Sequence, residues 1–277
     1  MKVAVFSDVQ GNIAALEVVV ADIEKWQPDL VILNGDLINR GPKNRECLRL
    51  FNEKADTQGW LPVRGNHEDF VLHCAENRPK SAGEAELRRF ADWTTQQLGA
   101  DVYSMVSWPD HLSLHGPQSD RWLHVTHGTL AGNRDGISPS VPDDHLHGKI
   151  PDDIDLFITA HTHKALQRVF ENKRILNVGS VGSPFDGDVR ASYARLLFSN
   201  DHWQSEIIRL EYDREQMARD CIESGFLSEA GPLASVIYRE WEQAALLMPF
   251  WNRKYRKAVQ SGEITLEDAV NEFLQTL

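Results

Sequence analysis

Five short apolar runs, each followed by a cluster of polar residues, constrain the fold of this chain more than any other feature. The runs are Val3–Phe6, Leu30–Leu33, Leu61–Val63, Trp122–Val125 and Leu156–Ile158. Short runs rich in Val, Ile and Leu, bounded by turn residues, are typical of buried strands. The stretch between the first two runs has apolar residues at helical spacing, namely Ile13, Leu16, Val20 and Ile23. This β-α-β order predicts parallel strands joined by crossover helices.

The polar clusters after these runs are candidates for one common site. Ligands of such sheets bind outside the carboxyl ends of the strands, so the five clusters are expected to meet. Their chemistry-bearing residues are Asp8, Gln10, Asp36, Asn66, His67, His127, His161 and His163. Carboxylate, amide and imidazole donors without cysteine suit Mn, Fe, Zn, Co or Ni. An isolated His at a strand end, or an Asp before a helix, has ordinary structural explanations, so the inference depends on all five ends together.

The rest of the chain departs from the β-α-β order. Residues 69–122 are predicted to form a helical insertion beside the site. Four further runs predict an antiparallel β-meander: Ala165–Phe170, Arg174–Val178, Ser192–Phe198 and Trp203–Tyr212. Amphipathic helices are expected from residue 213 onward. We therefore expect one domain over residues 1–212 and a helical C-terminal extension over residues 213–277.

Composition narrows the classes of partner. The chain of 277 residues has a formal net charge of -12, which disfavours extended nucleic acid and acidic membrane surfaces as partners. Two bound dications would reverse the charge locally, so a small phosphorylated substrate remains compatible. The chain starts in a predicted strand and has no apolar run near the roughly 20 residues of a membrane span. With three scattered cysteines, these features predict a cytoplasmic protein; the oligomeric state is left open.

The polar clusters resemble the signature of the calcineurin-like metallophosphoesterase family. The resemblance extends from Met1 to about Tyr212, and Ala91–Leu98 and Asn177–Asp188 are similar to its bacterial and archaeal phosphodiesterase-like branch, related to diadenosine-tetraphosphate hydrolases. It implies an α/β fold of two stacked mixed β-sheets flanked by helices. The matching segments are Asp8–Gln10, Gly35–Gly41, Gly65–Glu68, Thr126–Gly128 and Ala160–His163.

The resemblance also implies roles for single residues. One divalent ion would be held by Asp8, Gln10, Asp36 and His163. The second would be held by Asp36, Asn66, His127 and His161. A water between the ions would be the nucleophile, and the unligated His67 would protonate the leaving oxygen or hydrogen-bond the phosphoryl group. Arg40 and Asn66 are the candidate substrate-binding residues.

Two departures from the family pattern bear on function. Gln10 stands where the family usually has His, and an amide oxygen is a weaker donor than imidazole, which favours Mn over the softer ions. Asn39 stands where the protein-phosphatase branch has an Asp beside the catalytic His, so less positive charge is supported on His67. We expect a hydrolase of phosphodiester or phosphomonoester bonds in small substrates, with nucleotides or dinucleoside polyphosphates as candidates. The alternatives are a serine/threonine protein phosphatase and a binding scaffold of the same fold with weak catalysis.

Overall fold

The apolar runs near the N-terminus form parallel strands, as their pattern predicts. Strand β1 (Lys2–Phe6) pairs with β2 (Leu30–Asn34), which pairs with β3 (Leu61–Val63), all in parallel. Helix α1 (Ile13–Trp26) connects the first two strands, and the side chain of Asn12 caps it by accepting a hydrogen bond from the Ala15 N–H. This computed structural model describes residues 1–277.

Two five-stranded sheets stack on each other, which confirms the expected sandwich. The first sheet has the order β10-β9-β1-β2-β3 and the second has the order β4-β5-β6-β8-β7. The remaining strands are β4 (His111–His115), β5 (Trp122–Thr126), β6 (Leu156–Thr159), β7 (Leu166–Phe170), β8 (Lys173–Asn177), β9 (Ala191–Ser199) and β10 (His202–Leu210).

Strand β1 is buried on both faces because its side chains alternate between two cores. Val3 and Val5 belong to the core between the sheets, with Ile158 and Trp203 among their neighbours there. Phe6, on the opposite face, belongs to the core under α1 and α2 (Asn44–Gln58). The period of two along the strand therefore places one sheet between a second sheet and a helical layer.

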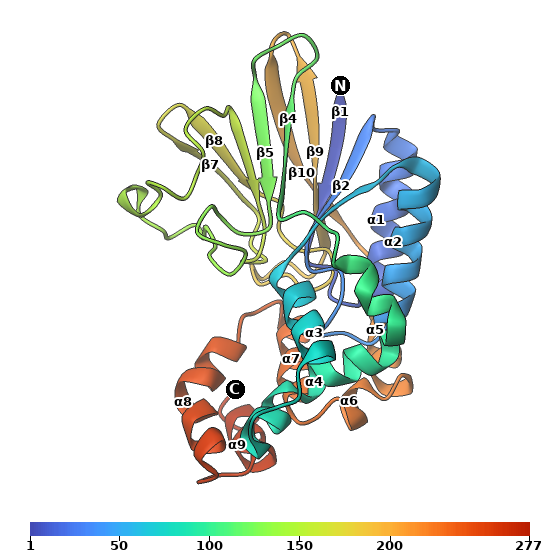
Figure 1. Ribbon diagram of the computed structural model, residues 1–277, viewed down its shortest axis with the longest axis vertical. Coiled ribbons are helices and arrows are strands. Elements are labelled where there is room, and N and C mark those ends of the chain that lie inside the picture. Colours follow the sequence, from blue (N-terminus) through green and yellow to red (C-terminus); the bar gives the residue numbers. More distant parts are fainter.

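Apart from α1 and α2, which cover the first sheet, the helices lie toward the carboxyl ends of the strands (Figure 1). Residues of α3 and α4 share a single apolar core with the C-terminal helices, so the predicted insertion and the predicted extension pack together. The boundary at residue 212 stays a prediction. These helices are α3 (Asn66–Glu76), α4 (Ala82–Leu98), η1 (Gly99–Met105), α5 (Arg214–Glu223), α6 (Phe226–Glu229), α7 (Leu233–Gln243), α8 (Met248–Ser261) and α9 (Leu266–Leu274).

Two parts of the sequence-based prediction are wrong. The predicted helical insertion over residues 69–122 includes β4, an edge strand whose residues alternate between exposed and half-buried. The predicted meander is two separate hairpins, because β7 and β8 lie in one sheet and β9 and β10 in the other. The segment between β8 and β9 crosses from sheet to sheet at the end of the sandwich where the polar clusters lie. No helix combines the length and apolar character that a membrane crossing requires.

Candidate metal centre

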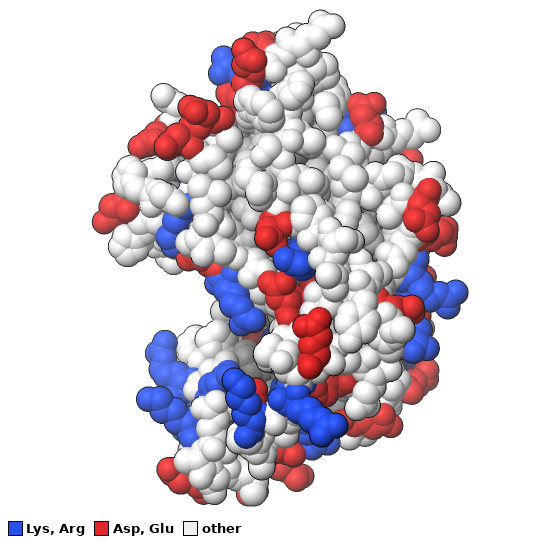
Figure 2. Space-filling model, viewed as in Figure 1, with Lys and Arg blue, Asp and Glu red and all other residues white.

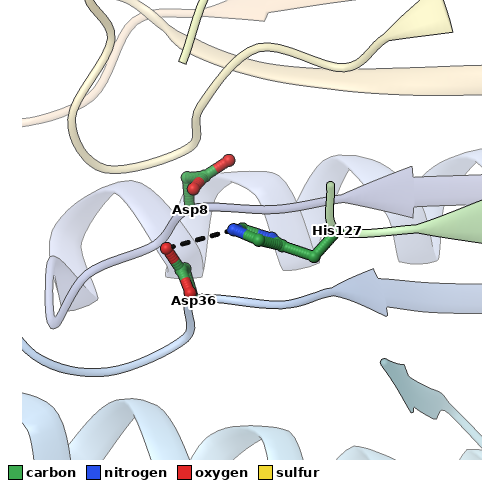
Figure 3. A group of neighbouring side chains, drawn as sticks. All are labelled: Asp8, Asp36 and His127. Carbon is green, nitrogen blue, oxygen red and sulfur yellow. Dashed lines mark ion pairs between the residues drawn. The ribbon is translucent and has the colours of Figure 1, made fainter. Parts of the chain in front are cut away.

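The carboxyl ends of strands from both sheets meet at one place. Asp8 and Asp36 follow β1 and β2 of the first sheet, and His127 follows β5 of the second. The three side chains point toward one another, and their ligand atoms all lie within 4.8 Å of one another (Figure 3). All three are buried. Residues that are distant in the sequence therefore form one cluster of oxygen and nitrogen donors.

Two groups of donors adjoin this cluster. In the first group, His163 Nε2 lies 3.1 Å from Asp8 Oδ1. In the second, Asn66 Oδ1 lies 3.1 Å from His127 Nε2 and 2.7 Å from His161 Nδ1. Asp36 adjoins the second group, because its Oδ2 is 3.3 Å from His127 Nε2. The carboxylate of Asp36 also belongs with Asp8 in the central cluster, so it lies where a carboxylate could bridge two ions.

Backbone carbonyls set the orientation of two of the imidazoles. His127 Nδ1 lies 2.8 Å from the Asn34 carbonyl oxygen, and His163 Nδ1 contacts the Ser183 carbonyl oxygen. Each carbonyl can accept only an N–H, so Nδ1 of each ring carries a proton and Nε2 faces the carboxylates. Metal-binding histidines are commonly oriented in this way.

The backbone at the site adopts an uncommon conformation. Left-handed φ angles of 55° at Asp8, 57° at Asp36 and 63° at His161 are unusual for residues with a side chain. Gly35, before Asp36, has φ of 83°, and a Cβ there would lie 2.6 Å from His127 Nδ1. Strained residues of this kind cluster at functional sites, where the surrounding structure holds them in place.

A buried glutamate joins the loop after β2 to the start of α3. Glu68 Oε2 accepts hydrogen bonds from the backbone N–H groups of Asp36 and Gly65, both at 2.8 Å, and Oε1 accepts one from Leu37 at 2.9 Å. Burial and the Asp36 carboxylate raise the pKa of Glu68 to about 7. The three N–H donors oppose this rise and favour the carboxylate. Glu68 thus fixes the backbone that carries Asp36.

Asp36 and His127 form a buried pair of opposite charge. Burial raises the pKa of Asp36, but the adjacent imidazoles of His127 and His67 outweigh burial and hold this pKa far below its usual value. Burial lowers the pKa of His127, yet Asp36 has the larger effect and raises it to about 10. The proton on His127 occupies the position in which a cation would meet the same carboxylate. Metal binding here is therefore coupled to proton release.

The donor set fits divalent cations. Asp8 Oδ1 and Asp36 Oδ2 are buried and face only the imidazole nitrogens described above, without a well-formed hydrogen bond, and buried oxygens of this kind are costly unless a cation or donor compensates them. Burial lowers the pKa of His161 to about 4, so its imidazole is neutral and able to donate to a metal at neutral pH. The mixture of carboxylate, amide and imidazole agrees with the harder first-row metals.

Gln10 and Arg40 lie beside the first group of donors and contact each other. The Gln10 amide nitrogen is 3.3 Å from His163 Nε2, and its oxygen accepts a hydrogen bond from Arg40 Nε at 3.1 Å. Arg40 also forms an ion pair with Glu240 of α7, and the Glu240 side chain is fully buried. In this arrangement the Gln10 oxygen is directed to Arg40 and away from the donors. Ligation by Gln10 stays a prediction, and this geometry counts against it.

His67 lies at the edge of the cluster. Its Nε2 is 3.9 Å from Asp36 Oδ2, and its Nδ1 is 2.8 Å from the Asn39 amide nitrogen. In this arrangement Asn39 donates to Nδ1, which leaves the ring proton on Nε2, toward the site. Burial lowers the pKa of His67 to about 3. The ring is therefore neutral at physiological pH and able to donate a hydrogen bond.

Glu68 and Glu240 both support the site structurally, but only the role of Glu68 can be predicted from the sequence. Glu68 lies three residues after the helix N-cap Gly65, the capping-box position, which marks it as an acceptor for the start of α3. Glu240 accepts hydrogen bonds from the Leu247 and Met248 N–H groups and pairs with Arg40. Nothing local to Glu240 predicts this role, because its partner is 200 positions away.

We expect Glu68→Gln to lower the free energy of unfolding by about 1–3 kcal/mol, the cost of a buried donor left unsatisfied. In the wild type, both carboxylate oxygens accept hydrogen bonds from backbone N–H groups. In the variant, the NH₂ group of the amide would face some of these N–H groups and could not accept from them. Chemical denaturation of the metal-free protein measures the change. Glu76→Gln, on the exposed face of the same helix, is the matched control and should have little effect. An equal stability of Glu68→Gln and the wild type would mean that Glu68 is protonated in the folded protein.

Comparisons with known proteins point to one family. Residues 1–165 match the model of the calcineurin-like phosphoesterase family. An uncharacterised protein of Methanocaldococcus jannaschii is 26% identical over 234 residues, which span 76% of this chain and 88% of that protein. The symmetrical bis(5'-nucleosyl)-tetraphosphatase of Delftia acidovorans is 26% identical over 159 residues, 52% of this chain and 56% of that enzyme.

A solved structure shows the same fold. The crystal structure of a metallophosphoesterase from Sphaerobacter thermophilus superposes with a TM-score of 0.66 at 24% sequence identity, and the match covers 88% of this chain and 100% of that one. The family match spans more than half of the chain and includes Asp8, Asp36, His127 and both histidines after β6. The chain therefore belongs to the calcineurin-like phosphoesterase family, whose members are metal-dependent hydrolases.

Proposed function

We propose that this protein binds two divalent metal ions and hydrolyses phosphodiester or phosphomonoester bonds of small substrates. The observation that carries the proposal is the position of the buried Asp36 carboxylate between two groups of donors. Nucleotides and dinucleoside polyphosphates are the first substrate class to test. The similarity to a bis(5'-nucleosyl)-tetraphosphatase supports this class.

The two proposed metal sites share Asp36. Asp8 and His163 would complete the first site, and Asn66, His127 and His161 would complete the second. When bound, the ions would acidify a water molecule and neutralise the developing charge of the phosphoryl group. We favour Mn because amide and carboxylate oxygens make up much of the donor set. The negative net charge of the chain makes this local positive charge important for attracting an anionic substrate.

His67 would act on the substrate without binding metal. Its Nε2–H points into the cleft, where it is able to donate a hydrogen bond to the phosphoryl group or to the leaving oxygen. Because burial lowers the pKa of His67 to about 3, we propose hydrogen-bond donation from the neutral ring as its main role. Arg40 lines the same cleft, which has a volume of about 620 Å³. Two of its guanidinium nitrogens are engaged by Gln10 and Glu240, so Arg40 is held in place beside the phosphoryl position.

Asp36→Asn should abolish both metal binding and the hydrolysis of bis(4-nitrophenyl) phosphate in the presence of Mn. His67→Ala should retain the metal and lose about 10²–10³-fold in rate, the usual cost of removing one hydrogen-bond donor to developing charge. Metal content by elemental analysis and initial rates separate the two effects. His202→Ala, at an exposed histidine on β10, is the control. Loss of metal in His67→Ala equal to that in Asp36→Asn would contradict the unligated role, and a metal-loaded wild type without turnover would favour the binding scaffold.

Asn39→Asp should raise the pKa of His67, because a carboxylate next to Nδ1 stabilises the imidazolium form. The rate should then acquire a dependence on pH near neutrality that the wild type lacks, since His67 is neutral in the wild type above pH about 4. Proton NMR of the histidine ring and pH–rate profiles measure both effects. Asn77→Asp, beside the exposed His73, is the matched control and should affect only that ring. An unchanged His67 pKa in Asn39→Asp would rule out Asn39 as the residue that sets it.

Gln10→Ala should change metal affinity by less than about tenfold, at the low end of losses for residues outside the ligand set. The reason is that the Gln10 oxygen already accepts a hydrogen bond from Arg40. Asp8→Ala should lose far more affinity, because it removes a buried carboxylate. Titration calorimetry with Mn and Zn compares the two variants. Equal losses in both would restore Gln10 as a ligand, and Gln10→His would then bind Zn more tightly.

A further inference from the structure

A second cavity adjoins the metal cleft on the side of His67. It has a volume of about 270 Å³ and lies between the ends of the strands and the helical layer. Five residues line both this cavity and the cleft, so the two spaces are neighbours. The shared lining residues are Arg40, Asn66, His67, Met248 and Asn252. A molecule bound at the metals therefore lies next to the second cavity, with His67 on the shared wall.

One part of the wall of the second cavity is apolar. Phe70 of α3 and Phe90 of α4 lie with their ring centroids 6.0 Å apart, and Leu87, Leu233 and Met248 complete the apolar lining. Ligand pockets are typically apolar with a few placed polar groups, and span about 300–1,000 Å³. A cavity of this size accommodates one flat group of a substrate rather than a whole dinucleotide.

Arginine side chains supply the positive charge around the cavity. Arg134, after β5, and Arg256, on α8, are exposed at its rim, and neither forms an ion pair with a carboxylate. Figure 2 shows basic side chains along the rim of the hollow between the sandwich and the C-terminal helices. The lining has one acidic side chain, Glu84, whose carboxylate accepts a hydrogen bond from the Lys80 N–H. In a chain of net charge -12, this local excess of positive charge marks a preference for anions.

A deeper arginine has an unused donor. Arg88 is 4% exposed and lines the cavity. Asp92 and the Cys74 carbonyl engage its Nε and Nη2, but its Nη1 has no hydrogen-bond partner. A buried guanidinium N–H without an acceptor is costly unless an acceptor is supplied. This nitrogen is enclosed by the protein, so the contribution of Arg88 to the cavity is its positive charge.

We propose that this cavity binds the leaving group of the substrate, and that the leaving group combines a flat aromatic body with a phosphate of its own, as a nucleoside phosphate does. The inference rests on the proposed phosphoesterase function and specifies its substrate. The aromatic body would pack on Phe70 and Phe90, and the phosphate would meet Arg134 and Arg256. His67 lines both spaces, which is the position required of a group that donates to the leaving oxygen.

Binding of AMP tests the proposal without turnover. Titration calorimetry of the full chain, with Mn and again with chelator, should give affinity for AMP at least about tenfold above that for adenosine or inorganic phosphate, since each probe lacks one half of the contact. Arg134→Gln and Arg256→Gln should each weaken AMP binding about two- to fivefold at low salt, as expected for exposed charge pairs. Higher salt should reduce the difference between these variants and the wild type.

Arg253→Gln is the matched control, because Arg253 is an exposed arginine on the same helix that lines neither cavity. An equal loss in this variant, or AMP affinity no higher than that of phosphate, would overturn the leaving-group site. The measurement in chelator separates this inference from the proposed function. AMP binding without hydrolysis of any diester would overturn the function and keep the site. Hydrolysis of bis(4-nitrophenyl) phosphate without arginine-dependent AMP binding would overturn the site alone.

Discussion

The hydrogen bonds of the Glu68 carboxylate determine where the central carboxylate of the site can lie. Glu68 connects the loop after β2 to the first turn of α3, and it holds the backbone N–H groups on both sides of that junction. Asp36 in turn accepts a hydrogen bond from the His67 N–H through its Oδ1. The strained loop, the donor carboxylate and the helix that carries Asn66 and His67 are thereby fixed relative to one another. The positions of Asp36, which both proposed metal sites share, and of Asn66 and His67 depend on this arrangement.

The sequence predicted the parts of the molecule whose signals are local. Apolar runs of strand length and an intervening helical period were sufficient for the parallel strands, and the turn residues after each run marked the carboxyl ends. Parallel topology then brings those ends together, so Asp8, Asp36 and His127 could be expected in one cluster before their distances were known. The sandwich itself followed from the family resemblance rather than from periodicity.

The features that the sequence did not predict depend on contacts between distant segments. The strand patterns after residue 165 do not reveal which sheet each hairpin joins, because pairing of β9 with β1 is decided by the core between the sheets. The orientation of the Gln10 amide depends on Arg40, whose own position depends on Glu240 in α7. The second cavity exists because α3 and α4 share a core with the last five helices. No sequence window contains these relationships.

The pairing of β1 with β9 has a consequence for how the chain is made. Lys2 pairs with Leu197, so during synthesis nearly two hundred residues must follow β1 before its second neighbour is available. Until then β1 has one unpaired edge, and its side chains are apolar on both faces. Exposed edges of this kind pair readily with other chains, and such late, non-local pairing slows folding. The order of the strands in the sheet thus makes the growing chain dependent on protection from aggregation during its synthesis.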